Sequence, residues 1–289
     1  MKFTVHLESI GLLKEALECN CDGIAFGGEF CEWKIPTLND LKNIYENVIK
    51  NDKKFVYMTS ILSNIGIDKL RDQITFLKDR GNAEVVIGDF GLLNLLSDYN
   101  GLTLRLGRPR VYIPGRCPWS QITRTPNPSF ITRYNIEKIF YQTNLNYLRT
   151  LELYKNYGIF NANVDWIPKV FPYYKTIIKN GFKLSVYTHV IPVAITMKCH
   201  MARFLNETEP EFCTKPCLNK SFKIHQNEVQ CDYTLHGNVV FRNIKINKSG
   251  VKELQRIGIE ELIIPMGPIS GLYTKKDVNN FISILLGEV

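Results

Sequence analysis

Three of the chain's eight cysteines lie within one short segment, CHMARFLNETEPEFCTKPC, which runs from Cys199 to Cys217. Thiols gathered in this way can form disulfides, hold zinc, form a redox pair or hold an iron–sulfur cluster. The chain contains no CxxC pair, which disfavours both a typical zinc site and a thioredoxin-like redox site. The amino-terminal sequence MKFTVHLESIGLLKEALE has no secretory pattern, so we expect a cytoplasmic protein, in which structural disulfides are rare.

The remaining choice, an iron–sulfur cluster, needs four thiolate ligands, and these can come from distant parts of the fold. Three are present in the clustered segment, at Cys199, Cys213 and Cys217. The candidates for the fourth are Cys19, Cys21, Cys31, Cys117 and Cys231. Which of them can reach the segment depends on the elements that position them.

Short apolar runs alternate with amphipathic segments along the chain. The expected strands are Lys2–Leu7, Gly23–Phe26, Lys54–Thr59, Glu84–Ile87, Leu102–Leu106, Phe160–Val164, Lys183–His189 and Glu261–Pro265. The expected helices are Ile10–Cys19, Thr37–Ile49, Asp68–Asp79, Leu92–Asp98, Leu145–Asn156, Val170–Lys179, Ser249–Arg256 and Asp277–Leu285. This alternation predicts a single α/β domain over residues 1–289, a (β/α)8 TIM-like barrel, with a doubly wound open sheet as the alternative. No GxGxxG turn follows the first strand, so a dinucleotide site has no support.

Two segments interrupt the alternation. Gly107–Ile136 is a connection rich in Pro and Arg, whose role the pattern leaves open. Residues 191–247 form an insertion between the last two barrel strands, and the insertion carries the three clustered cysteines. Its end alternates apolar and polar residues around the sequence HGN, which predicts a small β-hairpin.

Chemistry in such barrels lies at the carboxyl ends of the strands. That rule selects Glu29, Cys31, Thr59, Asp89, Arg105, Arg108, Asp165 and His189. An Asp at a strand end often only caps the next helix, and a lone His there is commonly structural. Cys31 lies at the same end as the insertion, so position alone ranks it first as the fourth ligand and Cys231 second. Cys19 and Cys21 precede the second strand and suit small buried thiols.

Four stretches of the chain carry a resemblance to a known family. They are GIAFGGEFC, IGDFGLLNLL, IPVAITMKCHMARFLNETEPEFCTKPC and VVFRNIKINKSGVKELQRIGIEELIIPMGP. In these stretches the chain resembles the U-thirty-two peptidase family, also called the collagenase-like proteases, and most closely its short, single-barrel branch. The cysteine pattern is the specific part of this resemblance, which is weak between Gly107 and Ile159.

The resemblance implies a [4Fe–4S] cluster held by Cys31, Cys199, Cys213 and Cys217. Cys231 is the second choice in place of Cys31. It implies a part in oxygen-independent hydroxylation, on a quinone precursor of ubiquinone biosynthesis or on RNA bases, with prephenate as the suggested oxygen donor. An arginine is the natural anchor for a dicarboxylate such as prephenate. The candidate substrate-binding residues are Arg105, Arg108 and Arg203, with Asp89 and His189 as weaker ones.

The resemblance also leaves the activity of the isolated chain open. In that branch the protein works with a paralogous partner, so a heterodimer and a non-catalytic, cluster-bearing subunit are alternatives. A peptidase is disfavoured, because the chain has no GxSxG and no HExxH motif.

The chain has a formal net charge of +8 and a pI near 9.0. Such a balance suits a nucleic-acid partner, but the lysines are scattered, as in KNDKK and YTKKD, so this reading is not favoured. No stretch approaches the ~20 apolar residues of a membrane span.

Overall fold

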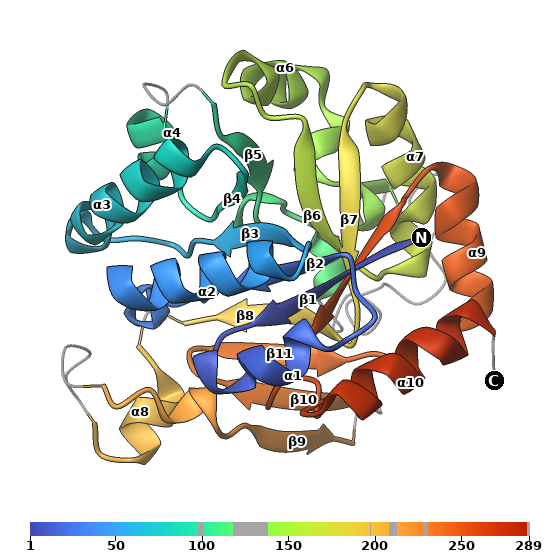
Figure 1. Cartoon of the computed structure of the whole chain (residues 1–289). Helices are drawn as coiled ribbons and strands as arrows, with labels where there is room; N and C mark the ends of the chain where they lie inside the picture. The colour runs from blue at the N-terminus through green and yellow to red at the C-terminus, as the bar shows by residue number, and fades with distance from the viewer. Residues whose placement is uncertain (97–100, 118–137, 197, 208–212, 228–230, 288–289) are drawn as a thin grey trace.

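The computed structural model describes residues 1–96, 101–117, 138–196, 198–207, 213–227 and 231–287. Eight parallel strands close into a barrel in the order β1–β12–β7–β6–β5–β4–β3–β2 (Figure 1). These strands are β1 Lys2–Leu7, β2 Gly23–Phe26, β3 Lys54–Met58, β4 Ala83–Ile87, β5 Thr103–Leu106, β6 Asn161–Asp165, β7 Lys183–Tyr187 and β12 Glu261–Pro265. The predicted (β/α)8 TIM-like barrel is confirmed, and the open sheet is excluded because β1 pairs with both β2 and β12.

Helices follow the barrel strands and pack around them. They are α1 Leu13–Leu17, α2 Leu38–Lys50, α3 Asn64–Arg80, α4 Phe90–Leu96, α6 Leu148–Asn156, α7 Phe171–Lys179, α9 Lys248–Ile257 and α10 Lys275–Leu286. Thr37 caps α2, since its hydroxyl accepts the backbone N–H of Asp40. In the described part of the chain, no helix is long and apolar enough to cross a membrane.

The barrel strands are buried along nearly their whole length, which is why they read as short continuous apolar runs. The main core fills the space between the strands and the helices. A smaller cluster lies separately and is made of Ala25, Val56, Met58, Val86, Tyr187 and Ile263. All six belong to barrel strands, so this cluster fills the barrel interior between its two polar ends.

The insertion builds a four-stranded antiparallel sheet in the order β8–β11–β10–β9. Its strands are β8 Val190–Ile195, β9 Phe222–Gln226, β10 Cys231–His236 and β11 Val239–Asn243. The predicted hairpin is present as β10 and β11, but it is not isolated. The apolar run at the start of the insertion forms strand β8, which pairs with β11. This pairing extends the hairpin into a larger sheet, whereas a lone two-stranded hairpin is only marginally stable in water. Sequence reasoning also missed the short helix α8, His200–Phe204.

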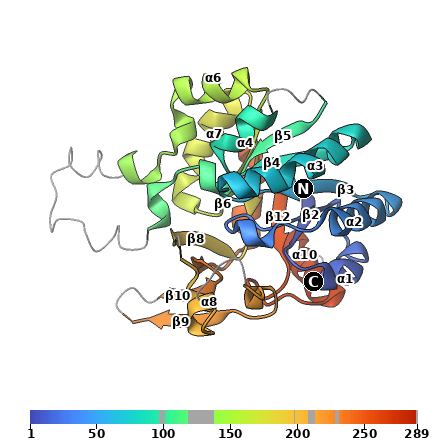
Figure 2. The same cartoon turned by 90° about the vertical axis from the view of Figure 1, so that its left-hand side faces the viewer.

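This sheet lies against the carboxyl end of the barrel, as both views show (Figures 1 and 2). A third buried cluster joins the two layers and consists of Phe30, Val190, Val239, Phe241 and Ile269. Phe30 follows β2 and Ile269 follows β12, so both come from the barrel's carboxyl end. The insertion is therefore positioned at the end predicted from sequence, and it is held there by apolar packing.

Candidate functional site

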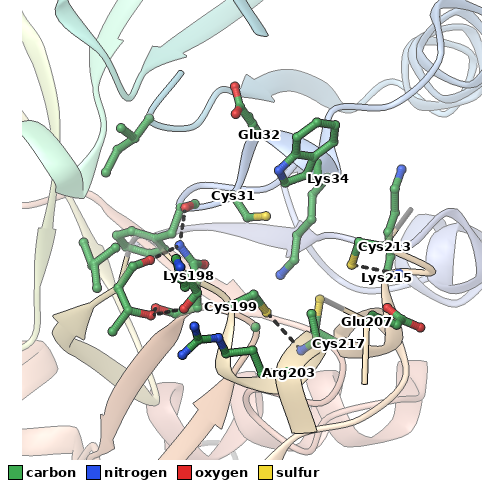
Figure 3. Close-up of a pocket in the computed structure, with 18 of the residues that line it drawn as sticks. Cys31, Glu32, Lys34, Lys198, Cys199, Arg203, Glu207, Cys213, Lys215 and Cys217 are labelled. Atoms are coloured by element: carbon green, nitrogen blue, oxygen red, sulfur yellow. Dashed lines mark hydrogen bonds between the residues drawn. The ribbon is translucent and has the colours of Figure 1, made fainter. Parts of the chain in front are cut away.

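A pocket of about 540 Å³ lies between the segment after β2 and the insertion. Its lining includes Cys31, Cys199, Cys213 and Cys217 (Figure 3). Residues 61–63, which precede α3, form another wall. The four cysteines named as cluster ligands from the sequence thus come from segments far apart in the chain and face one cavity.

Local backbone geometry presents each of these sulfurs. Cys31 is an extended residue just before the 3-10 turn Glu32–Lys34. Cys199 caps α8, and its Sγ accepts the backbone N–H of Ala202 at 3.4 Å. Cys213 Sγ accepts the backbone N–H of Lys215, also at 3.4 Å. Lys215 has a left-handed backbone with φ of 56°, and this reversal lets Cys217 line the same cavity as Cys213.

Three of the four thiols have a raised pKa, and the neighbouring thiols contribute to this. Burial raises the pKa of Cys31, and nearby Cys199 raises it further. Burial also raises the pKa of Cys217 to about 11, and Cys31 and Cys199 act in the same direction. Burial and Cys199 likewise raise the pKa of Cys213. A bound metal deprotonates a coordinating thiol outright, so a metal group would supply the missing positive charge here.

The chemistry of the donor set fits a cluster. A [4Fe–4S] cluster gives each of four thiolates an iron of its own, so its ligands stand apart around a larger body. Four thiols line one pocket of about 540 Å³ here, which is the donor set that such a cluster needs. Four thiolates on zinc would have to meet at a single tetrahedral centre. Across the described residues, no group of three His, Cys, Asp or Glu side chains is found that could hold a metal ion.

A buried group of charges lies beside the thiols. Lys34 Nζ donates to Glu8 Oε2 at 2.6 Å, and His236 Nε2 lies 2.6 Å from the same oxygen. Burial alone would lower the pKa of Lys34, but Glu8 outweighs this and raises it above its ordinary value. Burial alone would raise the pKa of Glu8, but Lys34 and His236 hold it well below its usual range. Burial and Lys34 lower the pKa of His236, so the group holds one cation, one anion and a neutral ring.

The cysteines outside the predicted set lie elsewhere. Cys231 begins β10 and is not part of the pocket lining. Burial raises the pKa of Tyr233, and Cys231 and Cys117 raise it further. These two thiols therefore lie near the phenol of Tyr233. Cys19 and Cys21 precede β2, where Lys53 Nζ donates to both of their carbonyl oxygens. Burial raises the pKa of Cys19 to about 12, in keeping with an inert buried thiol.

Arg108 is one of the arginines predicted to hold a dicarboxylate, and its donors are already used. It is 2% exposed, and its Nε and Nη2 both donate to Glu29 Oε2, at 2.9 and 2.6 Å. Its Nη1 reaches Asp165 and the Val190 carbonyl. The guanidinium also lies 3.6 Å from the ring centroid of Tyr187. Arg108 therefore fills the carboxyl end of the barrel as a buried ion pair, and its role as a substrate anchor stays a prediction.

Arg105, also predicted as a substrate anchor, lies toward the opposite end of the barrel from the thiol pocket. Its Nε and Nη2 donate to the two carboxylate oxygens of Glu84, and its Nη1 contacts Glu261 at 2.8 Å. Glu84 and Glu261 stand at or near the start of their strands, which places this buried network at the amino-terminal end. The barrel interior separates it from the thiol pocket.

The other predicted residues have separate positions. Arg203 lines the thiol pocket and is exposed, so its guanidinium is available there. Asp89 accepts the backbone N–H groups of Gly91 and Leu62, so it orders the start of α4 and one pocket wall. The segment Gly107–Ile136 is described only up to residue 117, and the rest lies outside the described residues.

His189 is a packing residue in this structure. It has a left-handed backbone with φ of 66°, and its ring centroid lies 4.3 Å from that of Phe281. Its Nδ1 contacts the hydroxyl of Thr188 at 2.8 Å. Burial lowers the pKa of His189 to about 4, so the folded chain favours the neutral ring.

This burial predicts a pH-dependent contribution to stability. The unfolded chain binds the proton near pH 6.5 and the folded chain only near pH 4. His189 should therefore cost no stability above pH 6.5 and up to about 1.4 kcal/mol per pH unit as the pH falls toward 4. The free energies of unfolding of the natural chain and His189→Asn, measured by urea titration from pH 8 to 4, should converge or cross below pH 6.5. Asn tolerates the left-handed backbone. The exposed His225→Asn serves as control, and a pH-independent difference for His189→Asn would contradict the prediction.

Some residues around the pocket carried no signal in the sequence. Lys34 is three residues after Cys31, but nothing in that spacing marks it as buried. Glu8 and His236 are 228 positions apart in the chain and meet only through the closed barrel and the inserted sheet. The resemblance could point to the cysteines, whereas these charges depend on the tertiary packing.

Comparisons with known proteins give only distant structural likenesses. No family model and no curated protein matches the chain. Among solved structures, KGPDC from Streptococcus mutans is 10% identical with a TM-score of 0.48, covering 99% of this chain and 97% of that one. N-(5'-phosphoribosyl)anthranilate isomerase from Pyrococcus furiosus is 10% identical with a TM-score of 0.47, covering 99% of each chain. Likenesses at this level carry no argument about activity.

Proposed function

We propose that this chain is a cytoplasmic iron–sulfur protein that binds a [4Fe–4S] cluster through Cys31, Cys199, Cys213 and Cys217. We further propose that it takes part in oxygen-independent hydroxylation of a quinone precursor or a related substrate. One observation carries the first part: four cysteines from two distant regions of the chain line one pocket. The second part is supported by the resemblance of the cysteine segments to the U-thirty-two family.

When bound, a cluster held by four thiolates supplies one-electron transfer, because no iron is left without a protein ligand. The chain's own residues would shape the surroundings of that group. Lys198 and Arg203 are exposed on the pocket lining and can attract an anionic molecule such as a dicarboxylate donor. The backbone N–H groups of Ala202 and Lys215 donate to two of the sulfurs and stabilise them as thiolates.

A second candidate is a non-catalytic, cluster-bearing subunit that serves a paralogous partner. The packing of the barrel mouth favours it. Arg108 lies between Phe30, Tyr187 and Phe241 at the carboxyl end of the barrel, which is where barrel enzymes place their substrates. Turnover by the isolated chain would exclude this candidate, and activity that appears only with a co-purified partner would support it.

The first test is anaerobic purification of the full chain. We expect a brown protein with about four irons and four sulfides per chain, since each cluster contains that number of each. Iron and sulfide analysis together with the electronic absorption spectrum would measure this. Colourless protein that takes up no iron and sulfide on anaerobic reconstitution would contradict the proposal. Colourless protein with one tightly bound zinc would replace it with a structural zinc site.

A further inference from the structure

Lys34 places a buried ammonium at the wall of the thiol pocket. Its side chain is only 5% exposed, although it lines the pocket together with the four cysteines. Its stem is seated against Gly28, where an added β-carbon would lie 2.5 Å from Lys34 Cβ. Only glycine leaves that space, so the stem of Lys34 packs directly on the backbone at Gly28. The charge at its end needs a reason, because taking an ammonium out of water is unfavourable.

Glu8 and His236 hold the Lys34 ammonium in place without using all of its N–H donors. One N–H points to Glu8 and lies 2.6 Å from its carboxylate, and Nζ is 2.9 Å from His236 Nε2. An ammonium has three donors, so at least one is left over by Glu8 and His236. Glu8 follows the end of β1, and its side chain is 13% exposed.

Two further observations place the ammonium close to the thiols. Lys34 Nζ and Cys217 Sγ both lie within 4 Å of the point where a β-carbon on Gly237 would sit. Figure 3 shows the lysine extending toward the space between Cys31 and the cysteines of the insertion.

We propose that Lys34 is a built-in counter-charge for the cluster, held by Glu8 and His236, and that it raises the reduction potential of the cluster. This inference rests on the proposed function. One-electron reduction adds a negative charge to the cluster, and a buried positive charge nearby stabilises the reduced form more than the oxidised form. Lys34 acts through the cluster and is a positioning residue, not a catalytic one. The exposed Lys198 on the same pocket cannot replace it, because water and salt screen its charge.

The test compares two variants that differ by one charge. Lys34→Met alone would leave Glu8 buried without a partner and endanger folding. We therefore use Glu8→Gln/Lys34→Met and Glu8→Gln/Lys34→Arg, which share the neutral glutamine. Both full-length chains are reconstituted anaerobically with iron and sulfide, their iron content is measured, and their reduction potentials are determined by EPR-monitored titration. Lys198→Met is the matched control, since it removes a lysine from the same pocket.

The methionine variant should have an equilibrium constant for reduction at least about tenfold below that of the arginine variant, a shift of about 59 mV for one electron. Lys198→Met should stay near the natural chain. Cluster loss in the methionine variant alone would also support the proposal, because the charge then helps to gather the thiolates. Equal potentials in the two double variants, or loss of the cluster in both while Lys198→Met loads normally, would overturn it. A natural chain that binds no cluster would instead overturn the proposed function.

Discussion

Cys31→Ser is expected to abolish cluster binding, with the iron content falling from about four per chain to near zero after anaerobic reconstitution. The physical reason is the position of this cysteine. It is the one proposed ligand outside the insertion, and it faces the other three across the pocket. A serine hydroxyl is a harder and far less acidic ligand than a thiol, so it cannot replace the thiolate at iron near neutral pH. Iron and sulfide analysis and the absorption spectrum are the measurements.

Cys231→Ser is the matched control for this experiment. Cys231 ranked second from sequence position, but in the structure it begins β10 beside Tyr233 and away from the pocket lining. Its serine variant should keep about four irons, and so should Cys19→Ser. If Cys231→Ser loses the cluster while Cys31→Ser keeps it, the ligand set proposed here is wrong.

The barrel could be predicted from sequence because its strands are short, buried on both faces and separated by amphipathic segments. Each of the eight predicted strands lies within two residues of the observed one at both ends. The inserted sheet was harder to predict. Its outer strand β9 is mostly exposed and carries a mixed pattern, and β8 reads as a continuation of the strand before it. The pairing of β8 with β11 is a long-range choice that no local pattern encodes.

The candidate site, like the fold, could be predicted from the sequence only in part. The cysteines could be named because a thiol pattern with a family resemblance is specific. Arg105 and Arg108 could not be interpreted, because an arginine near a strand end looks the same in sequence whether it faces solvent or a buried carboxylate. Their partners Glu84 and Glu29 lie 21 and 79 residues away and become neighbours only when the barrel closes. The buried cation of Lys34 was missed for the same reason, since Glu8 follows the end of β1 and His236 is in the insertion.

The position of Arg108 decides which part of the barrel's carboxyl end is open to a substrate. The carboxyl end of the barrel, where substrates normally bind, is occupied by its guanidinium and by the aromatic rings of Phe30, Tyr187 and Phe241. The sheet of the insertion packs over them. The cavity described here lies instead beside the barrel axis, between β2 and the insertion. Because an ion pair and apolar rings fill the mouth of the barrel, the candidate site lies at the cysteines instead.

Arg108→Met is therefore expected to destabilise the fold by about 3–5 kcal/mol, because it leaves the carboxylate of Glu29 buried without its cation. Glu29 is 1% exposed and accepts from both the backbone and the side chain of Arg108. Asp165 keeps a second partner, Arg116, whose Nε lies 2.5 Å from it, so the unpaired charge is mainly that of Glu29. Urea unfolding of the apoprotein followed by circular dichroism would measure the loss.

The double variant Glu29→Gln/Arg108→Met separates the charge from the packing. Removing both charges should recover much of the stability, since the coupling between directly paired residues reaches several tenths to about 3 kcal/mol. The exposed pair Arg71–Asp68 provides the control, and Arg71→Met should change stability by less than about 1 kcal/mol. If Arg108→Met unfolds no more easily than Arg71→Met, the guanidinium is not needed to close the barrel mouth. Arg108 would then be free to turn toward a ligand, and the barrel axis would return as a place for substrate.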